Sequence, residues 1–190
     1  MVFIEHALLA ACARKERSAQ YQLYKQCYSF LCGICMRYMK NREDADAILN
    51  IGFLKVLNNL DKYNPEIPFT LWLRRIMINT VIDEYRKNKK EKETFQSIDF
   101  GEHHSDFDDH SINEFIRQND AEYIHNMIRT LPPMSQRVFN LYAIDGFAHK
   151  EIAELLGMSE GTSKWHLNFA RTRLKELMTN MMQPLKKVGT

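Results

Sequence analysis

The sequence is poor in glycine and proline, and it has no long apolar run. Its 190 residues include 7 glycines and 5 prolines, about half the usual share of each residue. Apolar residues recur at the helical period of about 3.6 and rarely alternate, which predicts an all-α fold. A membrane-spanning helix needs about 18 consecutive apolar residues, and no segment approaches that length. We therefore expect no membrane insertion and a protein of the cytoplasm.

The chain also lacks a strong excess of either charge. Its formal net charge is +2 at pH 7, which by itself does not indicate nucleic-acid binding. The distribution is more informative, because basic residues cluster at 86–90 and again at 164–175. Between these clusters lies an acidic segment, residues 99–120. The pattern favours two basic regions separated by an acidic one.

Cysteine and histidine do not form a complete set of metal ligands. Cys32 and Cys35 have CxxC spacing, but no second such pair accompanies them. They lie in a helical apolar pattern, and a reducing compartment disfavours disulfides, so buried free thiols are expected. His103, His104 and His110 lie in the acidic segment without a rigid frame, so we expect no metal and no cofactor. An enzyme or metal-dependent redox sensor built on these residues is an alternative hypothesis.

The helical pattern predicts two small helical domains joined by a flexible acidic linker. The first domain covers residues 1–93 and the second covers residues 121–190. Residues 94–120 form the predicted linker, because the acidic part begins without a helical stripe. A short helix near residues 112–118 is expected within it.

Each domain is expected to contain several helices. In the first domain the predicted helices lie at about residues 2–13, 18–39, 42–60 and 69–87. Pro65 and Pro68 interrupt the helical pattern, so residues 61–68 are expected to form a loop. In the second domain predicted helices at about residues 123–131 and 136–144 are separated by Pro132 and Pro133.

Residues 149–177 carry the pattern of a helix-turn-helix. Ile152, Leu155 and Leu156 line one face of a first helix. Gly157 suits a left-handed turn, and Ser159 is a good N-cap for a second helix. This order of elements sets a recognition helix at an angle for the DNA major groove. An ordinary helical hairpin is the alternative.

The second helix of this motif has an inward and an outward face. At 100° per residue, the inward seam consists of Ser163, Leu167, Ala170, Leu174 and Leu177. The opposite side carries Gly161, Trp165, Asn168 and Thr172. Trp165 is expected to be exposed and to contact thymine methyls or sugar, with packing on another domain or a partner protein as the alternative. The flanking bases Lys164, Arg171 and Arg173 are expected to meet phosphates.

The helix predicted at residues 69–87 is apolar around nearly its whole circumference. Such a helix is normally buried on more than one side, so it is expected to be central to the first domain. Arg74, Arg75 and Asn79 are its polar exceptions. Arg75 and Asn79 lie about 40° apart on one flank.

The two halves together resemble the bacterial sigma-70 family, in particular its small extracytoplasmic-function group. Residues 41–60 and 69–90 resemble region 2, and residues 131–174 resemble region 4. The region 2 pattern F-x-x-W-L-x-x-I-x-x-N-x-x-x-D-x-x-R falls on Phe69, Trp72, Leu73, Ile76, Asn79, Asp83 and Arg86. The resemblance covers nearly the whole chain, and the joint order of the motifs is more specific than either alone.

The resemblance implies a transcription initiation factor and no enzymatic activity. Proteins of this group bind core RNA polymerase through the third helix of region 2. They open the −10 element and hold a flipped base beside the fourth helix, and region 4 reads the −35 element. The implied partners are core RNA polymerase, promoter DNA and, as is usual in the family, an anti-sigma factor. The acidic linker is expected to thread through the polymerase.

The resemblance and the side-chain chemistry together assign three sets of residues. The −10 set captures an unstacked base and the strand backbone: Tyr63, Phe69, Arg74, Arg75, Ile76, Asn79, Arg86 and Lys87. The −35 set on the recognition helix is Ser159, Glu160, Gly161, Thr162, Lys164, Trp165, His166, Asn168, Phe169, Arg171 and Arg173. The polymerase-binding set is Asp44, Asp46, Asn50 and Phe53.

The sequence departs from the family pattern in two places. In the third helix the customary Asp, Gln and Glu are replaced by Ala47, Asn50 and Ile51. In the recognition helix Ser163 stands where Val is usual, and residues that are often Ser, Arg and Arg are replaced by Trp165, His166 and Phe169. Because arginine readout of guanine is less available, we expect an unusual promoter preference.

A stand-alone helix-turn-helix regulator that binds duplex DNA is the main alternative. Such a protein normally needs a dimer and two half-sites. The additional domain, with its apolar helix and flanking basic residues, argues against it.

Overall fold

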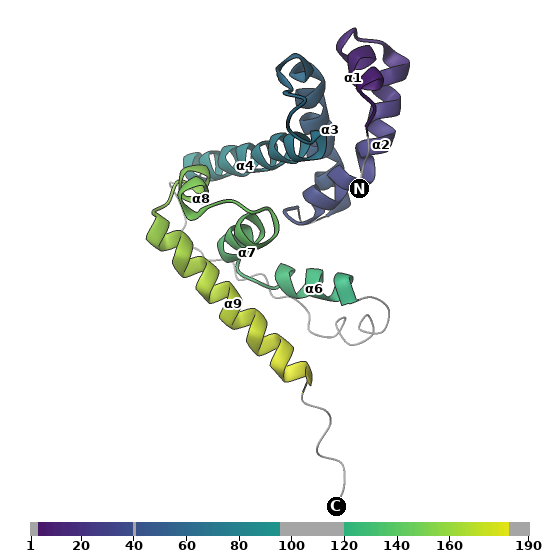
Figure 1. Cartoon of the computed structure of the whole chain (residues 1–190). Helices are drawn as coiled ribbons and strands as arrows, with labels where there is room; N and C mark the ends of the chain where they lie inside the picture. The colour runs from purple at the N-terminus through teal and green to yellow at the C-terminus, as the bar shows by residue number, and fades with distance from the viewer. Residues whose placement is uncertain (1–3, 40, 96–119, 183–190) are drawn as a thin grey trace, which may run out of the picture. The chain divides into compact units, whose positions relative to one another are not determined.

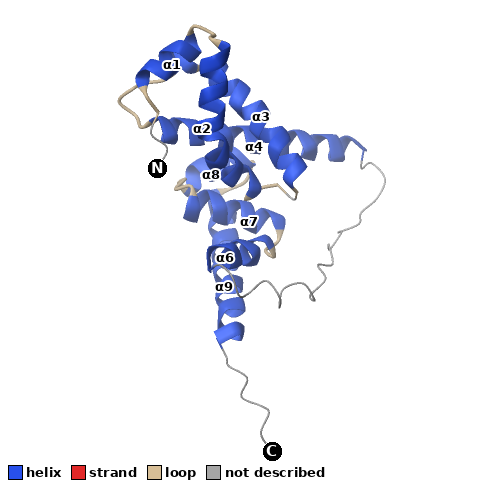
Figure 2. Ribbon diagram, turned by 90° about the vertical axis from the view of Figure 1, so that its right-hand side faces the viewer, coloured by secondary structure: helices blue, strands red, loops and turns tan. Residues whose placement is uncertain are grey.

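The computed structural model describes residues 4–39, 41–95 and 120–182. The chain divides into two compact units, Met1–Asp99 and Phe100–Thr190, each of which we describe by itself. Every regular element in the described ranges is helical (Figures 1 and 2), so the all-α prediction is confirmed. Most of the predicted linker, including its histidines and the short helix at 112–118, lies outside the described residues. The domain limits 1–93, 94–120 and 121–190 stay predictions.

The first unit is a set of helices joined by short turns. Its elements are α1 (His6–Ala13), α2 (Arg17–Met36), α3 (Arg42–Asn58), a 3-10 turn (Leu60–Lys62) and α4 (Phe69–Phe95). Helix α2 ends before the predicted residue 39, because Tyr38 and Met39 donate their backbone N–H groups to Cys35 in a closing turn. Helix α4 continues past the predicted residue 87, through a segment rich in the good helix formers lysine and glutamate.

Helix α4 packs against both α2 and α3. Its side chains Leu73, Met77, Ile78 and Ile82 are fully buried, which confirms its predicted central place in the core. Helix α3 approaches α4 closely at Gly52, where an added Cβ would lie 2.5 Å from Cε of Met77. The small residue therefore allows the close contact that positions α3 beside α4.

The cysteines of this unit are free and buried, as predicted. Burial raises the pKa of Cys27 and of Cys35 to about 12 in each case. These thiols are therefore protonated at neutral pH and poor nucleophiles. Within the described ranges no group of three or more histidine, cysteine or acidic side chains has a metal-binding arrangement, and no helix there is long and apolar enough to cross a membrane.

The second unit contains α6 (Asp120–Arg129), α7 (Pro133–Phe139), a π-helical turn (Asn140–Ile144), α8 (His149–Leu156) and α9 (Glu160–Met182). Helix α7 begins at Pro133, ahead of the predicted residue 136, because proline at the first helical position loses no hydrogen bond. Its continuation widens into the π turn, in which Asp145 donates its N–H to the carbonyl of Asn140 at 2.9 Å. Ile128, Leu131 and Ala170 form a buried core cluster between α6 and α9.

Candidate nucleic-acid interface

The turn between α8 and α9 is made by the residues that the sequence predicts. Gly157 ends α8 in the left-handed conformation, with φ 65° and ψ 45°, where a residue without Cβ is favoured. Ser159 caps α9, because its Oγ accepts the backbone N–H of Thr162 at 3.0 Å. The helix-turn-helix is therefore fixed by local interactions at both sides of the turn.

Replacing Ser159 with alanine is expected to destabilise the start of α9 by about 1 kcal/mol, because the Thr162 N–H loses its partner. Amide exchange in the first turn of α9, followed by mass spectrometry, should become about fivefold faster. Thr162→Ala is the matched control, since it removes only the hydroxyl contact with Ser159 at 2.9 Å and keeps the backbone bond. Equal acceleration in both variants would contradict the assigned cap.

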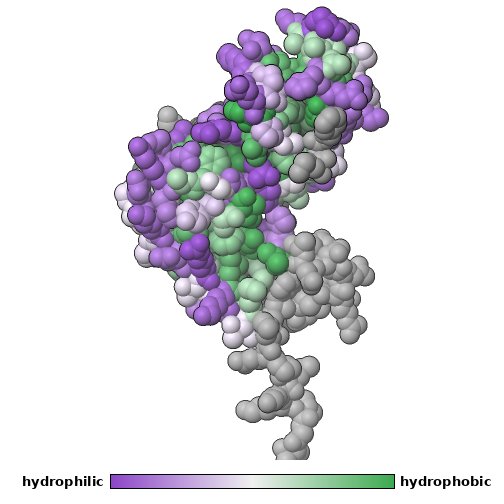
Figure 3. All heavy atoms as spheres, in the orientation of Figure 1, coloured by the Kyte–Doolittle hydropathy of each residue, from purple (hydrophilic) through white to green (hydrophobic). Residues whose placement is uncertain are grey.

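The two faces of α9 agree with the prediction. Ser163, Leu167 and Ala170 are buried, while Leu174 and Leu177 are half-buried. The opposite face is exposed at Gly161, Trp165, Asn168 and Thr172. In the space-filling view hydrophilic residues cover much of the visible side of this helix (Figure 3).

Two aromatic side chains stand on the outward face of α9. Trp165 is 60% exposed and Phe169 is 38% exposed. Their rings stack with centroids 5.5 Å apart and planes inclined by 22°. Lys164, Arg171 and Arg173 are also exposed on this helix, so an apolar pair is flanked by cations.

The side chain of His166 lies toward α7, unlike those of its exposed neighbours in the predicted −35 set. Its Nδ1 lies 2.9 Å from Oγ of the buried Ser135 on α7, at hydrogen-bond distance. Burial lowers the pKa of His166 below its usual value. The contact directs this ring toward α7, and its assignment to DNA binding stays a prediction.

The buried hydroxyl of Ser163 has a hydrogen-bond partner on α8. Its Oγ lies 2.9 Å from Nδ1 of His149, the first residue of α8. The ring of His149 stacks on Tyr142 with centroids 4.5 Å apart, and the Arg171 guanidinium lies 5.6 Å from the Tyr142 centroid. A hydroxyl without a partner would be costly there, so His149 stabilises the serine that departs from the family pattern.

The stability of the second unit is expected to fall on acidification because of His149. Burial, with added repulsion from Lys164 and Arg171, lowers the pKa of His149 below its usual 6.5. As the pH falls below 6.5, His149 binds a proton in the unfolded chain before it does so in the folded chain. The free energy of unfolding therefore decreases from pH 6.5 down to the lower pKa of His149 in the folded chain. Urea unfolding at pH 7 and pH 5.5 should show this loss. His149→Gln should reduce it, and an unchanged pH dependence in that variant would contradict the assignment.

The first unit has an open pocket of about 280 Å³ between α3, the 3-10 turn and α4. It is lined by Lys55, Asn59, Lys62, Trp72, Ile76, Asn79 and Thr80. The structure thus brings together Ile76 and Asn79 of the predicted −10 set. Tyr63 and Phe69 do not line the pocket, but each packs on Trp72, at 5.3 and 5.6 Å between ring centroids.

The polar groups of this pocket are held by one another. Lys62 donates from Nζ to Oδ1 of Asn59 at 2.9 Å, and Nδ2 of Asn59 donates to the Lys55 carbonyl at 2.8 Å. The Lys55 ammonium pairs with Asp83 at 3.0 Å. An aromatic face, amides and ammonium groups together suit a planar base with polar edges.

Sequence reasoning missed the part of the pocket that α3 and the 3-10 turn supply. Lys55, Asn59 and Lys62 are close to α4 only in the folded chain. Trp72 belongs to the region 2 pattern and could have been found from the sequence, but it was not included in the predicted −10 set. The helical spacing of Trp72, Ile76 and Asn79 places them along one side of α4.

The arginines of the predicted −10 set separate in the structure. Arg74 is half-buried and lies over Phe30 of α2, 5.6 Å from the ring centroid, so it faces α2 and not the flank of Asn79. Arg75, Arg86 and Lys87 are exposed on α4. Helical geometry places Arg86 about 20° from Arg75, on the flank that also carries Asn79.

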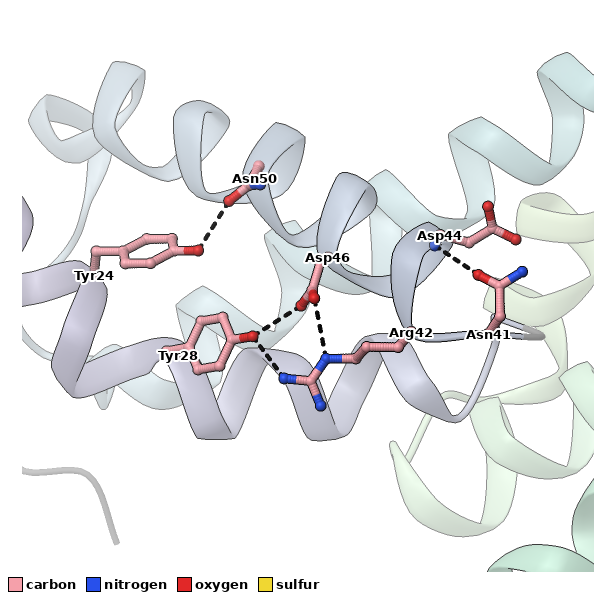
Figure 4. Close-up of polar contacts among 7 residues, drawn as sticks. All are labelled: Tyr24, Tyr28, Asn41, Arg42, Asp44, Asp46 and Asn50. Carbon is pink, nitrogen blue, oxygen red and sulfur yellow. Dashed lines mark hydrogen bonds and ion pairs between the residues drawn. The ribbon is translucent and has the colours of Figure 1, made fainter.

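Most of the predicted polymerase-binding set is engaged within the first unit (Figure 4). Asp46 accepts the Tyr28 hydroxyl at 2.9 Å and pairs with Arg42 at 3.0 Å. Asn50 accepts the Tyr24 hydroxyl at 3.0 Å. These contacts join α3 to α2 and leave Asp44 exposed at the start of α3.

A stripe of exposed apolar residues runs along α3 beside these contacts. It consists of Ala47, Ile51 and Leu54, which we call the α3 stripe, and Ile51 and Leu54 are 47% and 59% exposed. Phe53, by contrast, is buried and packs edge-on against Tyr24. Spacing of four and three residues puts the members of the stripe on one side of the helix. The sequence contains this spacing, but an exposed apolar stripe was not predicted from it.

The comparisons with known proteins agree with this arrangement. Residues 23–91 match the family model for Sigma-70 region 2, and residues 121–174 match the model for Sigma-70, region 4. The first match contains the α3 stripe and the pocket, and the second contains the helix-turn-helix.

Similar proteins match most of the chain. The ECF RNA polymerase sigma-E factor of Haemophilus influenzae is 24% identical, over 95% of this chain and 96% of that protein. The RNA polymerase sigma factor YlaC of Bacillus subtilis is 28% identical, over 87% of this chain and 95% of that protein. The solved structure of the sigma factor RpoE of Bartonella quintana, in complex with the anti-sigma factor NepR, has a similar fold. Its TM-score is 0.52 at 18% identity, over 84% of this chain and 96% of that one.

Proposed function

Because the chain belongs to the sigma-70 family, with the region 2 and region 4 domains of the extracytoplasmic-function group, we propose a division of labour between its two units. The protein is a promoter-specific initiation factor of RNA polymerase. Region 2 melts the −10 element and region 4 reads the −35 element. The observation that supports this division most directly is that one chain carries both the pocket at Asn79 and the exposed face of α9.

The pocket of region 2 is the proposed place for a base extruded from the −10 element. Trp72 and Ile76 offer a ring face and an apolar wall, and the Asn79 amide offers a donor and an acceptor. Arg75, Arg86 and Lys87 are placed for the strand backbone, because phosphates are neutralised by such exposed cations. Arg74 acts in packing against α2 instead.

The surface that meets core RNA polymerase is proposed to be the α3 stripe together with Asp44. Asp46 and Asn50 then contribute indirectly, because they fix α3 against Tyr28 and Tyr24 of α2. An apolar strip with a charged end suits an interface whose centre is dehydrated and whose rim is polar. An anti-sigma factor that covers the same stripe would exclude the polymerase.

The proposal also covers the domain limits, the path of the linker, the site of action and the mode of action. The limits 1–93, 94–120 and 121–190 are proposed for region 2, the linker and region 4, and the linker is proposed to thread through the polymerase. The site of action is the cytoplasm, where bacterial RNA polymerase meets the chromosome. The protein acts by binding, with no enzymatic step of its own.

Transcription in vitro on a promoter library tests the function. With core RNA polymerase the protein is expected to select promoters that share a −10 and a −35 element, while neither component alone initiates at them. A stand-alone regulator would instead protect duplex DNA as a dimer without polymerase. A dimer footprint without polymerase, and no transcription with it, would overturn the proposal.

A further inference from the structure

We propose that Trp165 and Phe169 read thymine methyl groups in the −35 element, as one rigid apolar platform. The inference rests on the proposed function of region 4 and adds the chemistry of its base recognition. It assigns promoter specificity to two residues that stand where the family usually has polar or basic side chains. The occupant of this exposed face is therefore duplex DNA with thymines at the contacted positions.

The aromatic pair is preformed in the protein. The rings of Trp165 and Phe169 stack at 5.5 Å between centroids with planes 22° apart, so each limits the rotamers of the other. Ser163 and Ala170 on the opposite side of α9 are fully buried, which fixes the rotation of the helix. The two side chains therefore lose little conformational entropy when they bind DNA, and this smaller cost favours binding.

Thymine is the base whose major-groove edge fits an apolar platform. Its C5-methyl is the one apolar group that an unmodified base presents in this groove. Guanine is commonly read by a bidentate arginine, but the arginines of α9 lie to the sides of the platform. Arg171 lies against Tyr142, and Arg173 pairs with Glu176 at 3.1 Å.

The surroundings of the platform favour DNA over a protein partner. Lys164, Arg171 and Lys175 are exposed along one flank of the outward face. Helical geometry puts them within about 40° of one another, as a row of cations that matches a phosphate backbone. An apolar centre beside such a row combines base contact with backbone positioning.

The spacing of the rings predicts the spacing of the thymines. Base pairs follow one another at about 3.4 Å along each strand, and the ring centroids are 5.5 Å apart. This separation falls between one and two base steps. The two contacted thymines are therefore adjacent or separated by a single base pair.

The test removes single methyl groups from the promoter. The −35 element is first defined by in vitro transcription with core RNA polymerase, and each thymine is then replaced by deoxyuridine. We expect two positions, adjacent or next but one, at which the holoenzyme binds the promoter about fourfold more weakly, as the loss of one buried methyl predicts. Other thymines should tolerate the change.

Protein variants then link the methyl groups to the platform. Trp165→Ala should weaken binding to the thymine promoter about tenfold and make one deoxyuridine substitution silent, and Phe169→Ala should do the same for the other. Thr172→Ala, on the same exposed face, is the matched control and should keep both methyl effects. Circular dichroism should show that helix content is unchanged in all three variants.

Two other results are informative. If the holoenzyme initiates transcription but no deoxyuridine substitution weakens binding, the inference is overturned, and a loss in Trp165→Ala would then mark a contact with protein or sugar. If the protein gives no promoter-specific transcription with core polymerase, the proposed function fails before the platform is tested.

Discussion

Leu54→Asp is expected to weaken binding to core RNA polymerase at least about thirtyfold. Leu54 is 59% exposed on α3, compared with 47% for Ile51 in the same α3 stripe. The few hot-spot residues at the dehydrated centre of an interface contribute about 2 kcal/mol or more each, and a new carboxylate there must also lose its hydration. Because the side chain has few contacts within region 2, the fold should not change. Titration of labelled core polymerase with the full-length protein measures the effect.

The control for this variant is Leu71→Asp. Leu71 is a leucine of similar exposure, 54%, in the same unit but on α4. It receives the same new charge, so it reports any general effect of an added carboxylate on solubility or stability. Near-normal polymerase binding is expected. If both variants bind equally well, or lose binding equally, the α3 stripe is not the polymerase surface.

The features that the sequence predicted correctly are those that local chemistry determines. Gly157 and Ser159 define the turn because a left-handed backbone and an N-cap each depend on residues a few positions apart. The exposure of Trp165 followed from the helical period and the buried seam opposite. The family resemblance supplied the order of the two domains.

The features that were missed depend on how helices face one another. The family resemblance assigned Asp46 and Asn50 to polymerase binding, but tyrosines of α2 reach both of them. Arg74 was assigned to the same −10 set as Asn79, although it lies about 140° from Asn79 around α4, where it contacts Phe30 of α2. Such pairings require the rotation and distance of two helices, which a periodic pattern in one segment does not contain.

The pocket of region 2 combines residues that the sequence predicted with residues that only the packing of the helices brings together. Ile76 and Asn79 were found because they belong to one helix and one motif. Asn59 was expected at the end of the helix at 42–60 and Lys62 in the loop at 61–68, and only the fold brings both to α4. The chemistry of the pocket is therefore a tertiary property, although its centre was visible in the sequence.

Asn79→Ala is expected to slow open-complex formation by about tenfold to a hundredfold while closed-complex binding stays nearly unchanged. Asn79 is exposed at the pocket, and its amide is proposed to pair with the edge of an extruded base. Such specific base contacts contribute about 1–3 kcal/mol. The base is extruded only in the open complex, so the loss should be confined to that step.

The two steps can be separated experimentally on one promoter. Competitor-resistant complexes and a fluorescent base in the −10 element report opening, whereas polymerase binding to the closed promoter at low temperature reports the earlier step. Asn88→Ala is the matched control, because Asn88 is exposed on the same helix and about 180° away by helical geometry. It should open the promoter normally. An equal loss in both steps for Asn79→Ala would contradict base capture and indicate a general contribution to DNA binding.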